Sequence, residues 1–308
     1  MKSFIKRYQE RVQTTQSILC VGLDLTPEHV PPEFGSGENV NHVRNYLEHV
    51  ITIAAERAPV VKPQFAYYGA MGYHGIVLLK ILVDFAHDKG LEVILDHKIS
   101  DIGSTVEAYG RWIFGYLEVD AVTAVPYLGS SIVTPLIPWL AKGKCVISMV
   151  RTSNPEAADL QDLELANGQL VYEMIAERVR SWNEFVSKET NNIGSVGAVV
   201  GATWPEQAAR CREFLGPDVF TLVPGYGAQG GGAEGAVIAV PNNQGQLYGT
   251  VNSSRGITMQ SWQKKDGSPK PGDPLDHVIT AIDRANADLN TALTALVERD
   301  PYGKEIKS

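Results

Sequence analysis

Short apolar runs rich in β-branched residues alternate with longer amphipathic stretches along almost the whole chain. The short runs are nearly continuous in apolar residues, as a parallel strand covered by helices on both faces requires. The longer stretches repeat their apolar residues at helical spacing. Eight strands are therefore predicted, at residues 18–25, 60–64, 91–99, 121–127, 144–152, 196–203, 219–226 and 246–253.

This alternation of strands and helices indicates an α/β fold. Eight such units favour a single (β/α)8 TIM barrel over an open, doubly wound sheet. No Pro- or Ser-rich linker divides the chain, so residues 1–308 are expected to form one domain, with an N-terminal helix within 1–17 and a polar tail at 300–308. The predicted later helices cover 40–57, 76–89, 105–117, 170–188, 206–215 and 274–299.

Length and charge limit the classes of partner more than they limit the fold. At roughly 150 residues per domain, 308 residues would also allow two domains. The formal net charge of −8 argues against nucleic acid and anionic membranes as partners, but a small anion could still bind where a few cations meet in one pocket. A cytoplasmic location is expected, because the N-terminal segment is interrupted by Lys2, Lys6, Arg7 and Arg11 before a signal-peptide core could form.

The cysteines and histidines form no pattern typical of a metal site or a disulfide. Cys20, Cys145 and Cys211 are far apart and odd in number, and they lie in apolar or helical contexts. Reduced thiols with a structural role are the favoured interpretation. The seven histidines form no H-x-x-x-H or mixed Cys/His cluster, so no transition-metal site is expected.

Polar side chains stand at or just after the carboxyl ends of the predicted strands. In a barrel of this class, the loops at that end carry the active site. Three long polar connections follow the same strand ends, at 153–169, 227–245 and 256–273, and loops of this length usually act as lids or binding loops. The residues assigned to this active face are Asp24, Lys62, Asp96, Lys98, Ser153, Gln229 and Arg255.

The segment LEVILDHKISDI at 91–102 concentrates opposite charges at the end of the third predicted strand. Strand periodicity places Asp96 and Lys98 on one face and His97 on the other. Asp101 follows three residues after Lys98, so two carboxylates are expected to flank one ammonium. Such pairing keeps Lys98 protonated and positioned, which suits a general acid that protonates a carbanion. A structural ion-pair network at a strand exit would show the same pattern.

Two further charged residues have both a functional and a structural interpretation. Lys62, in VVKPQ, ends the second strand and is either an active-site cation or a solvated residue at the rim. Asp24, in VGLDLTP, either caps the following turn or accepts hydrogen bonds from sugar hydroxyls.

Residues 224–232 read PGYGAQGGG and contain the dinucleotide-binding pattern G-x-G-x-x-G. The pattern lies in the seventh unit instead of the first, and no acidic residue ends the next strand, which argues against a dinucleotide fold. In barrels, the loops after strands seven and eight commonly bind phosphate through backbone N–H groups. Arg255 would clamp a phosphate there through its planar guanidinium, so a phosphate site is predicted. A flexible loop and a surface arginine are the structural alternative.

The four motifs DHKISDI, VKPQ, VPGYGAQGG and SSRG together resemble the orotidine 5′-phosphate decarboxylase family in its longer, bacterial-type form, over about residues 20–257. The resemblance implies a carboxy-lyase without metal or organic cofactor, which converts orotidine 5′-monophosphate to UMP and CO₂ in the last step of de novo pyrimidine nucleotide biosynthesis. It also implies a homodimer with shared active sites. Departures from the family pattern, none of which removes a catalytic charge, occur at His97, Ile99, Ser100, Val125 and Gly69.

The resemblance implies catalytic roles for four residues that match the family by position. Lys98 would donate the proton to C6 of the pyrimidine, and Asp96 would face the departing carboxylate. Lys62 would contact the ribose and hold Asp96 within the charged array. Asp101 would reach into the active site of the partner subunit.

It also implies five further substrate-binding residues. Asp24 would bind the ribose, and Thr105 would act in the partner's site. Ser153 would bind the pyrimidine, whereas Gln229 and Arg255 would bind the phosphate.

Two other functions fit part of the pattern. A Mg²⁺-dependent sugar-phosphate lyase or decarboxylase of the same superfamily would share D-x-K-x-x-D, but such relatives place an acidic metal ligand at the second strand end, where this chain has Lys62. A catalytically silent nucleotide-binding barrel would bind UMP and never consume the substrate.

Overall fold

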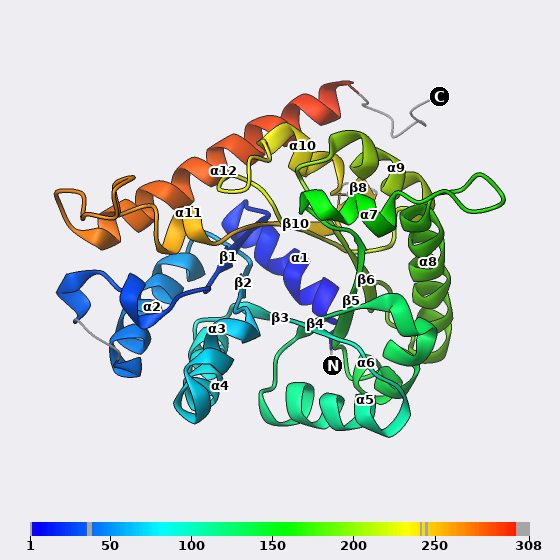
Figure 1. Ribbon diagram of the computed structural model, residues 1–308, viewed down its shortest axis with the longest axis horizontal. Helices are drawn as coiled ribbons and strands as arrows, with labels where there is room; N and C mark the ends of the chain where they lie inside the picture. The colour runs from blue at the N-terminus through cyan, green and yellow to red at the C-terminus, as the bar shows by residue number, and fades with distance from the viewer. Residues whose placement is uncertain (1, 36–38, 241, 244–245, 300–308) are drawn as a thin grey trace.

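The computed structural model describes residues 2–35, 39–240, 242–243 and 246–299, and eight parallel strands close into a barrel in the order β1-β10-β7-β6-β5-β4-β3-β2 (Figure 1). This confirms the predicted barrel. The predicted polar tail at 300–308 lies outside the described residues. The barrel strands are β1 (Leu19–Gly22), β2 (Val60–Lys62), β3 (Glu92–Ile99), β4 (Ala121–Ala124), β5 (Cys145–Arg151), β6 (Val196–Val200), β7 (Thr221–Val223) and β10 (Gly249–Ser253).

All eight predicted strands are present, but each is shorter than the apolar run that predicts it. The first run continues past β1 because Leu23 and Leu25 are also buried, although they lie beyond the strand. The eighth prediction began too early. Residues of β9 (Gln246–Leu247) pair antiparallel with β8 (Asn242–Asn243), and the barrel strand starts only at Gly249.

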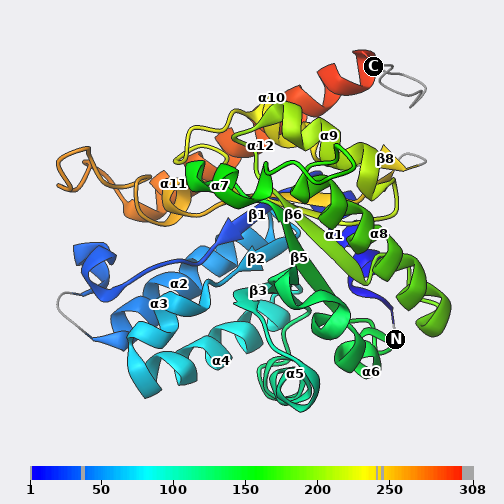
Figure 2. The same cartoon turned by 45° about the vertical axis from the view of Figure 1, so that its right-hand side comes forward.

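Helices surround the barrel on the outside (Figures 1 and 2), and the predicted amphipathic stretches account for most of them. The single helix predicted at 105–117 is an α-helix followed by a π-helical segment, η3 (Arg111–Tyr116). The short helix α3 was not predicted. The main helices are α1 (Phe4–Thr15), α2 (Val40–Ala55), α3 (Phe65–Ala70), α4 (Gly72–Asp88), α5 (Gly103–Gly110), α8 (Val171–Thr190), α9 (Pro205–Leu215) and α12 (Pro274–Arg299).

The connections after the strands contain short helices, including the three connections that the sequence predicted as long polar loops. The three long loops on the active face are therefore partly ordered by their own backbone hydrogen bonds. These short elements are η1 (Pro27–His29), η2 (Pro32–Phe34), η4 (Pro126–Ile132), η5 (Thr134–Leu136), α6 (Ile137–Leu140), η6 (Pro155–Ala157), α7 (Ala158–Gln161), α10 (Ala233–Ile238) and α11 (Arg255–Thr258).

Helix α1 closes the barrel at the amino ends of its strands (Figure 1). The rings of Phe4 and Tyr8 both meet Phe220 edge-on, with centroids 5.2 Å apart in each pair. The Tyr8 hydroxyl donates to the carbonyl of Gly249 at the start of β10. Apolar side chains of the described residues therefore fill the interior at this end of the barrel.

The predicted state of the thiols is confirmed, since Cys20, Cys145 and Cys211 are free and buried. Burial raises the pKa of the Cys20 and Cys211 thiols to about 12, so both remain protonated at neutral pH. In the part of the chain that is described, no helix has the length and apolar character needed to cross a membrane.

A network of ion pairs connects α1 to the amino ends of β3 and β4. The Arg7 guanidinium lies 2.8 Å from carboxylate oxygens of both Glu92 and Asp120. Asp120 also accepts from Lys144 at 3.4 Å and lies 2.9 Å from Nε2 of His87. Burial opposes the imidazolium, but the hydrogen bond to Asp120 and its charge hold the pKa of His87 above its usual value.

We expect this imidazolium to make the free energy of unfolding depend on pH. A raised folded pKa stabilises the protein below the unfolded value of about 6.5, and that stabilisation is lost as the pH rises through the folded value. Urea unfolding between pH 6 and pH 9 should therefore show a smaller decline in His87→Gln than in the wild type. The exposed His74→Gln serves as control, and identical pH slopes in all three proteins would contradict the prediction.

Candidate active site

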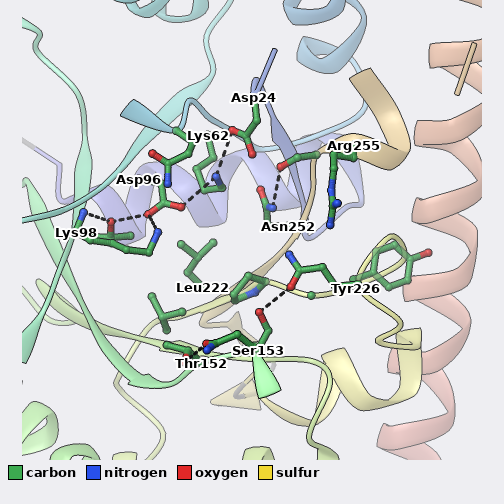
Figure 3. A pocket seen from close by; sticks show the side chains of 18 of the residues that line it. Asp24, Lys62, Asp96, Lys98, Thr152, Ser153, Leu222, Tyr226, Asn252 and Arg255 are labelled. Atoms are coloured by element: carbon green, nitrogen blue, oxygen red, sulfur yellow. Dashed lines mark hydrogen bonds and ion pairs between the residues drawn. The ribbon is translucent and has the colours of Figure 1, made fainter. Parts of the chain in front are cut away.

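A cavity of about 390 Å³ opens at the carboxyl ends of the barrel strands (Figure 3). Every barrel strand, or the residues directly after it, contributes to its lining. All seven residues that the sequence assigned to the active face line this one cavity. Those that carry charge are Asp24, Lys62, Asp96, Lys98 and Arg255.

Four of these residues form a continuous array of alternating charges (Figure 3). Nζ of Lys62 lies 3.6 Å from Oδ1 of Asp24 and 3.5 Å from Oδ2 of Asp96. Nζ of Lys98 lies 2.6 Å from Oδ1 of Asp96, so this carboxylate contacts both ammonium groups. The Lys62 side chain is only 4% exposed, and a charge buried that deeply requires such partners.

The array keeps Asp96 and Lys62 ionised at neutral pH. Burial alone would raise the pKa of Asp96, but Lys62, Lys98 and the hydroxyl of Thr123 hold it at about 2. Burial would likewise lower the pKa of Lys62, but the carboxylates of Asp24 and Asp96 hold it above its usual value. A permanent carboxylate and a permanent ammonium therefore lie side by side in the cavity.

His97 points away from the cavity, as strand periodicity predicted. Its ring packs among aromatic side chains on the outer face of β3, with centroids 4.2 Å from Phe65, 5.6 Å from Trp112 and 5.7 Å from Tyr109. Burial lowers the pKa of His97, so the imidazole is neutral at physiological pH. This residue belongs to the packing between β3 and the helices.

Ser153 and Gln229 meet on the side of the cavity opposite the charged array. The hydroxyl of Ser153 donates to Oε1 of Gln229 at 2.8 Å. Ser153 lies close to two glycines: a Cβ on Gly201 would come within 2.8 Å of its Cα, and a Cβ on Gly225 within 3.0 Å of its Cβ. Glycine at both positions therefore allows the segment after β5 to approach the ends of β6 and β7.

The glycine-rich segment after β7 is a hydrogen-bonded loop. The amide of Gly227 donates to the carbonyl of Gly231, and the amide of Gly231 donates to the carbonyl of Gly225, both at 2.9 Å. Gly225, Gly227 and Gly230 have positive φ angles of 101°, 74° and 91°, which side-chain-bearing residues rarely adopt. The hydroxyl of Tyr226 donates to Asp288 of α12 at 3.1 Å, which fixes the loop against that helix. Figure 3 shows the Tyr226 ring extending away from the charged array toward this helix.

Asp101 and Thr105 are not among the residues that line this cavity. The carboxylate of Asp101 accepts from the amide of Ile102 at 2.8 Å and, among the described residues, forms no ion pair with Lys98. The expected flanking of Lys98 by two carboxylates is therefore corrected: within one chain, Asp96 alone provides it. The reason is that β3 ends at Ile99, and the chain turns away before α5 begins.

Comparison with known proteins identifies the relatives of this site. Residues 17–266 match the family described as orotidine 5′-phosphate decarboxylase / HUMPS. The chain belongs to this family.

Curated members of the orotidine 5′-phosphate decarboxylase family match over most of their length. The orotidine 5′-phosphate decarboxylase of Halorubrum lacusprofundi is 37% identical over 287 residues, which cover 92% of this chain and 96% of the relative. That of Dechloromonas aromatica is 38% identical over 259 residues, covering 83% and 89%.

Solved structures agree with this assignment. The orotidine-monophosphate-decarboxylase candidate of Toxoplasma gondii has a TM-score of 0.83 at 25% identity and covers 97% of this chain and 98% of its own. The OMP decarboxylase of Leishmania donovani has a TM-score of 0.74 at 28% identity, with 94% and 98% covered.

Three polar residues near the site were missed in the sequence, although each interrupts an apolar strand. Thr123 of β4 donates to Oδ1 of Asp96 at 2.8 Å. Asn252 of β10 lines the cavity, and its buried Oδ1 has no hydrogen-bond partner in the described structure. Arg151 of β5 binds Asp162 through two hydrogen bonds of 2.9 and 3.0 Å, which hold the 153–169 segment against the strand end.

The described residues contain no group of three or more His, Cys, Asp or Glu side chains placed to hold a metal ion. In the cavity, the ammonium of Lys62 lies between the carboxylates of Asp24 and Asp96. A cation from the chain itself therefore compensates the charge of these two carboxylates.

We expect Lys62→Met to destabilise the fold, because Asp24 and Asp96 would lose a shared and buried counter-charge. Breaking a buried ion pair from one side typically costs about 3 kcal/mol of unfolding free energy. Urea unfolding at pH 7 measures the change. Adding Asp96→Asn to Lys62→Met should recover part of the loss, and a single variant as stable as the wild type would contradict this account.

Proposed function

We propose that this chain removes CO₂ from orotidine 5′-monophosphate to form UMP. The observation that carries the proposal is the 2.6 Å ion pair between Lys98 and Asp96 inside the cavity. Membership of the family and 34–38% identity to curated orotidine 5′-phosphate decarboxylases support the same reaction.

In the proposed reaction, the bond between C6 of the pyrimidine and the carboxylate carbon breaks. CO₂ departs, and the electron pair of that bond stays on C6. The fixed ammonium of Lys98 stabilises this developing charge and then transfers one proton to C6. The resulting neutral amine recovers its proton from solvent, so one solvent proton is consumed in each turnover and no other reactant is needed.

Asp96 is proposed to face the carboxylate that leaves. Because its pKa is held at about 2, it remains an anion throughout the working pH range. Repulsion between the two carboxylates disappears once neutral CO₂ forms. The interaction is therefore less unfavourable in the transition state than in the bound substrate, and this difference favours the reaction.

The opposite end of the cavity is proposed to bind the phosphate. Figure 3 shows Lys98 and Arg255 at opposite ends of the site, with Lys62 and Asp24 between them. Gln229 and Arg255 would contact the phosphate, and Ser153 the pyrimidine. The buried Oδ1 of Asp24, which lacks a hydrogen-bond donor in the described structure, suits a ribose hydroxyl.

We also propose a homodimer in which Asp101 and Thr105 complete the partner's site. Both residues belong to the segment from the end of β3 into α5, outside the cavity of their own chain. The same side carries exposed apolar side chains, since Ile102 is 58% and Tyr127 of the neighbouring η4 is 82% exposed. Burying this surface between two chains would favour association.

The turnover assay tests the reaction directly. Purified protein should lower the ultraviolet absorbance of orotidine 5′-monophosphate, with no effect of EDTA. Lys98→Ala should reduce kcat by at least about 10³-fold, because it removes both the proton donor and the charge at C6. Lys188→Ala, on the exposed surface of α8, should match the wild type.

Three results would contradict the proposal. No turnover at micromolar enzyme would exclude the reaction. Binding of UMP without consumption of substrate would indicate a silent barrel. Metal-dependent activity on a hexulose phosphate would indicate the lyase alternative.

Mixed dimers test the shared site. Lys98→Ala and Asp101→Ala should each be nearly inactive alone. If the two residues act in one site from different chains, a mixed dimer carries one intact site, so random exchange of equal amounts should restore about a quarter of the wild-type activity. Full activity of Asp101→Ala alone would contradict the shared site. So would a failure of the mixed dimers to recover activity after subunit exchange.

A further inference from the structure

Strand β3 contains a bulge at the place where its catalytic candidates stand. Its parallel register with β4 pairs Ile94 with Ala121 and Leu95 with Val122, but the next pair is Ile99 with Ala124. Three residues of β3, 96–98, therefore lie opposite one residue of β4, which is Thr123. A bulge of this kind interrupts the ladder and leaves backbone N–H groups that need another acceptor.

The hydroxyl of Thr123 supplies that acceptor. It accepts from the amides of His97 at 3.0 Å and Lys98 at 2.9 Å. It donates its proton to Oδ1 of Asp96 at 2.8 Å. A hydroxyl has one donor and two acceptor positions, so these three bonds use its full capacity. The side chain is completely buried, so these three bonds, and not water, satisfy the hydroxyl.

The bulge gives Lys98 an unusual backbone conformation. Its φ angle is +56°, in the left-handed region that costs a side-chain-bearing residue free energy and persists only where neighbouring contacts hold it. The bond from its amide to Thr123 is such a contact. In this conformation, Nζ of Lys98 comes within 2.6 Å of Oδ1 of Asp96, the oxygen that Thr123 also contacts.

We propose that Thr123 is a positioning residue for the decarboxylation, whose hydroxyl fixes both the carboxylate of Asp96 and the backbone from which Lys98 reaches C6. Thr123 acts only through these two groups and exchanges no proton with the substrate. The inference rests on the proposed function, because it assigns a role relative to the proton donor and the carboxylate of that reaction.

Two pairs of proteins isolate the hydroxyl. The first pair is the wild type and Thr123→Val, which keeps the shape of the side chain and removes the hydroxyl. Thr123→Ser keeps the hydroxyl and removes the methyl group. Displacing a catalytic group by a fraction of an ångström lowers kcat strongly, so we expect Thr123→Val to lose about 10- to 100-fold in kcat. KM for orotidine 5′-monophosphate should stay within about threefold, since the phosphate and ribose contacts remain intact. Thr123→Ser should retain kcat within about threefold of the wild type.

The second pair, Thr123→Ala against Thr123→Ser, also differs only by the hydroxyl and gives the same test if the valine variant does not fold. Thr221→Val is the matched control, because Thr221 is equally buried in β7 and donates to the carbonyl of Ala239, away from the ion pairs. It should lower the midpoint of thermal unfolding and keep kcat within twofold.

Three outcomes would overturn the inference. The first is a kcat within twofold of the wild type in Thr123→Val, or in Thr123→Ala if the valine variant does not fold. The second is a kcat of Thr123→Ser no higher than that of the variant without a hydroxyl. The third is an equal loss of kcat in Thr221→Val. Wild type and Lys98→Ala are assayed alongside. If the wild type consumes no substrate, the proposed function fails. If it does and only the Thr123 variants contradict expectation, the positioning role alone fails.

Discussion

The active face depends on the cost of burying charge at the mouth of an apolar barrel. Lys62 is almost completely buried, and it is stable there only because Asp24 and Asp96 lie on either side of it. Asp96 in turn requires Lys98, because Lys62 is shared with Asp24 and compensates only part of the charge of Asp96. Nζ of Lys98 lies 2.6 Å from Oδ1 of Asp96 and supplies the rest. The positions of three strand ends are therefore coupled to each other through electrostatics.

That coupling needs a rigid barrel, and the opposite end of the molecule provides it. Phe4 and Tyr8 of α1 fill the interior against Phe220, and Arg7 of the same helix ties the amino ends of β3 and β4 together through Glu92 and Asp120. When the amino ends of two paired strands are fixed relative to each other, the register at their carboxyl ends is fixed as well. The relative heights of β3 and β4, on which the bulge depends, are thus set in part far from the cavity.

The sequence predicted what depends on local pattern, and missed what depends on register between strands. Apolar runs show where strands lie, and the barrel topology brings their carboxyl ends together, so Asp24, Lys62, Asp96 and Lys98 could be placed on one face. The bulge at 96–98 is different, because nothing within β3 shows how many of its residues oppose β4. Thr123 therefore read as one more β-branched strand residue. The course of the chain at Asp101 was missed for a related reason: spacing of three residues indicates proximity only while the strand continues.

The two ends of the cavity hold their charges differently, and this difference matters for the proposed reaction. Among the described side chains, Lys62 and Lys98 share the carboxylates of Asp24 and Asp96, whereas Arg255 has no carboxylate partner. A phosphate would therefore gain a new ion pair at Arg255, and a substrate carboxylate would enter a region already balanced in charge. Binding free energy must then come mainly from the phosphate end. The charges at the reacting end therefore contribute little to binding of the substrate. They stabilise chiefly the transition state, in which negative charge develops at C6.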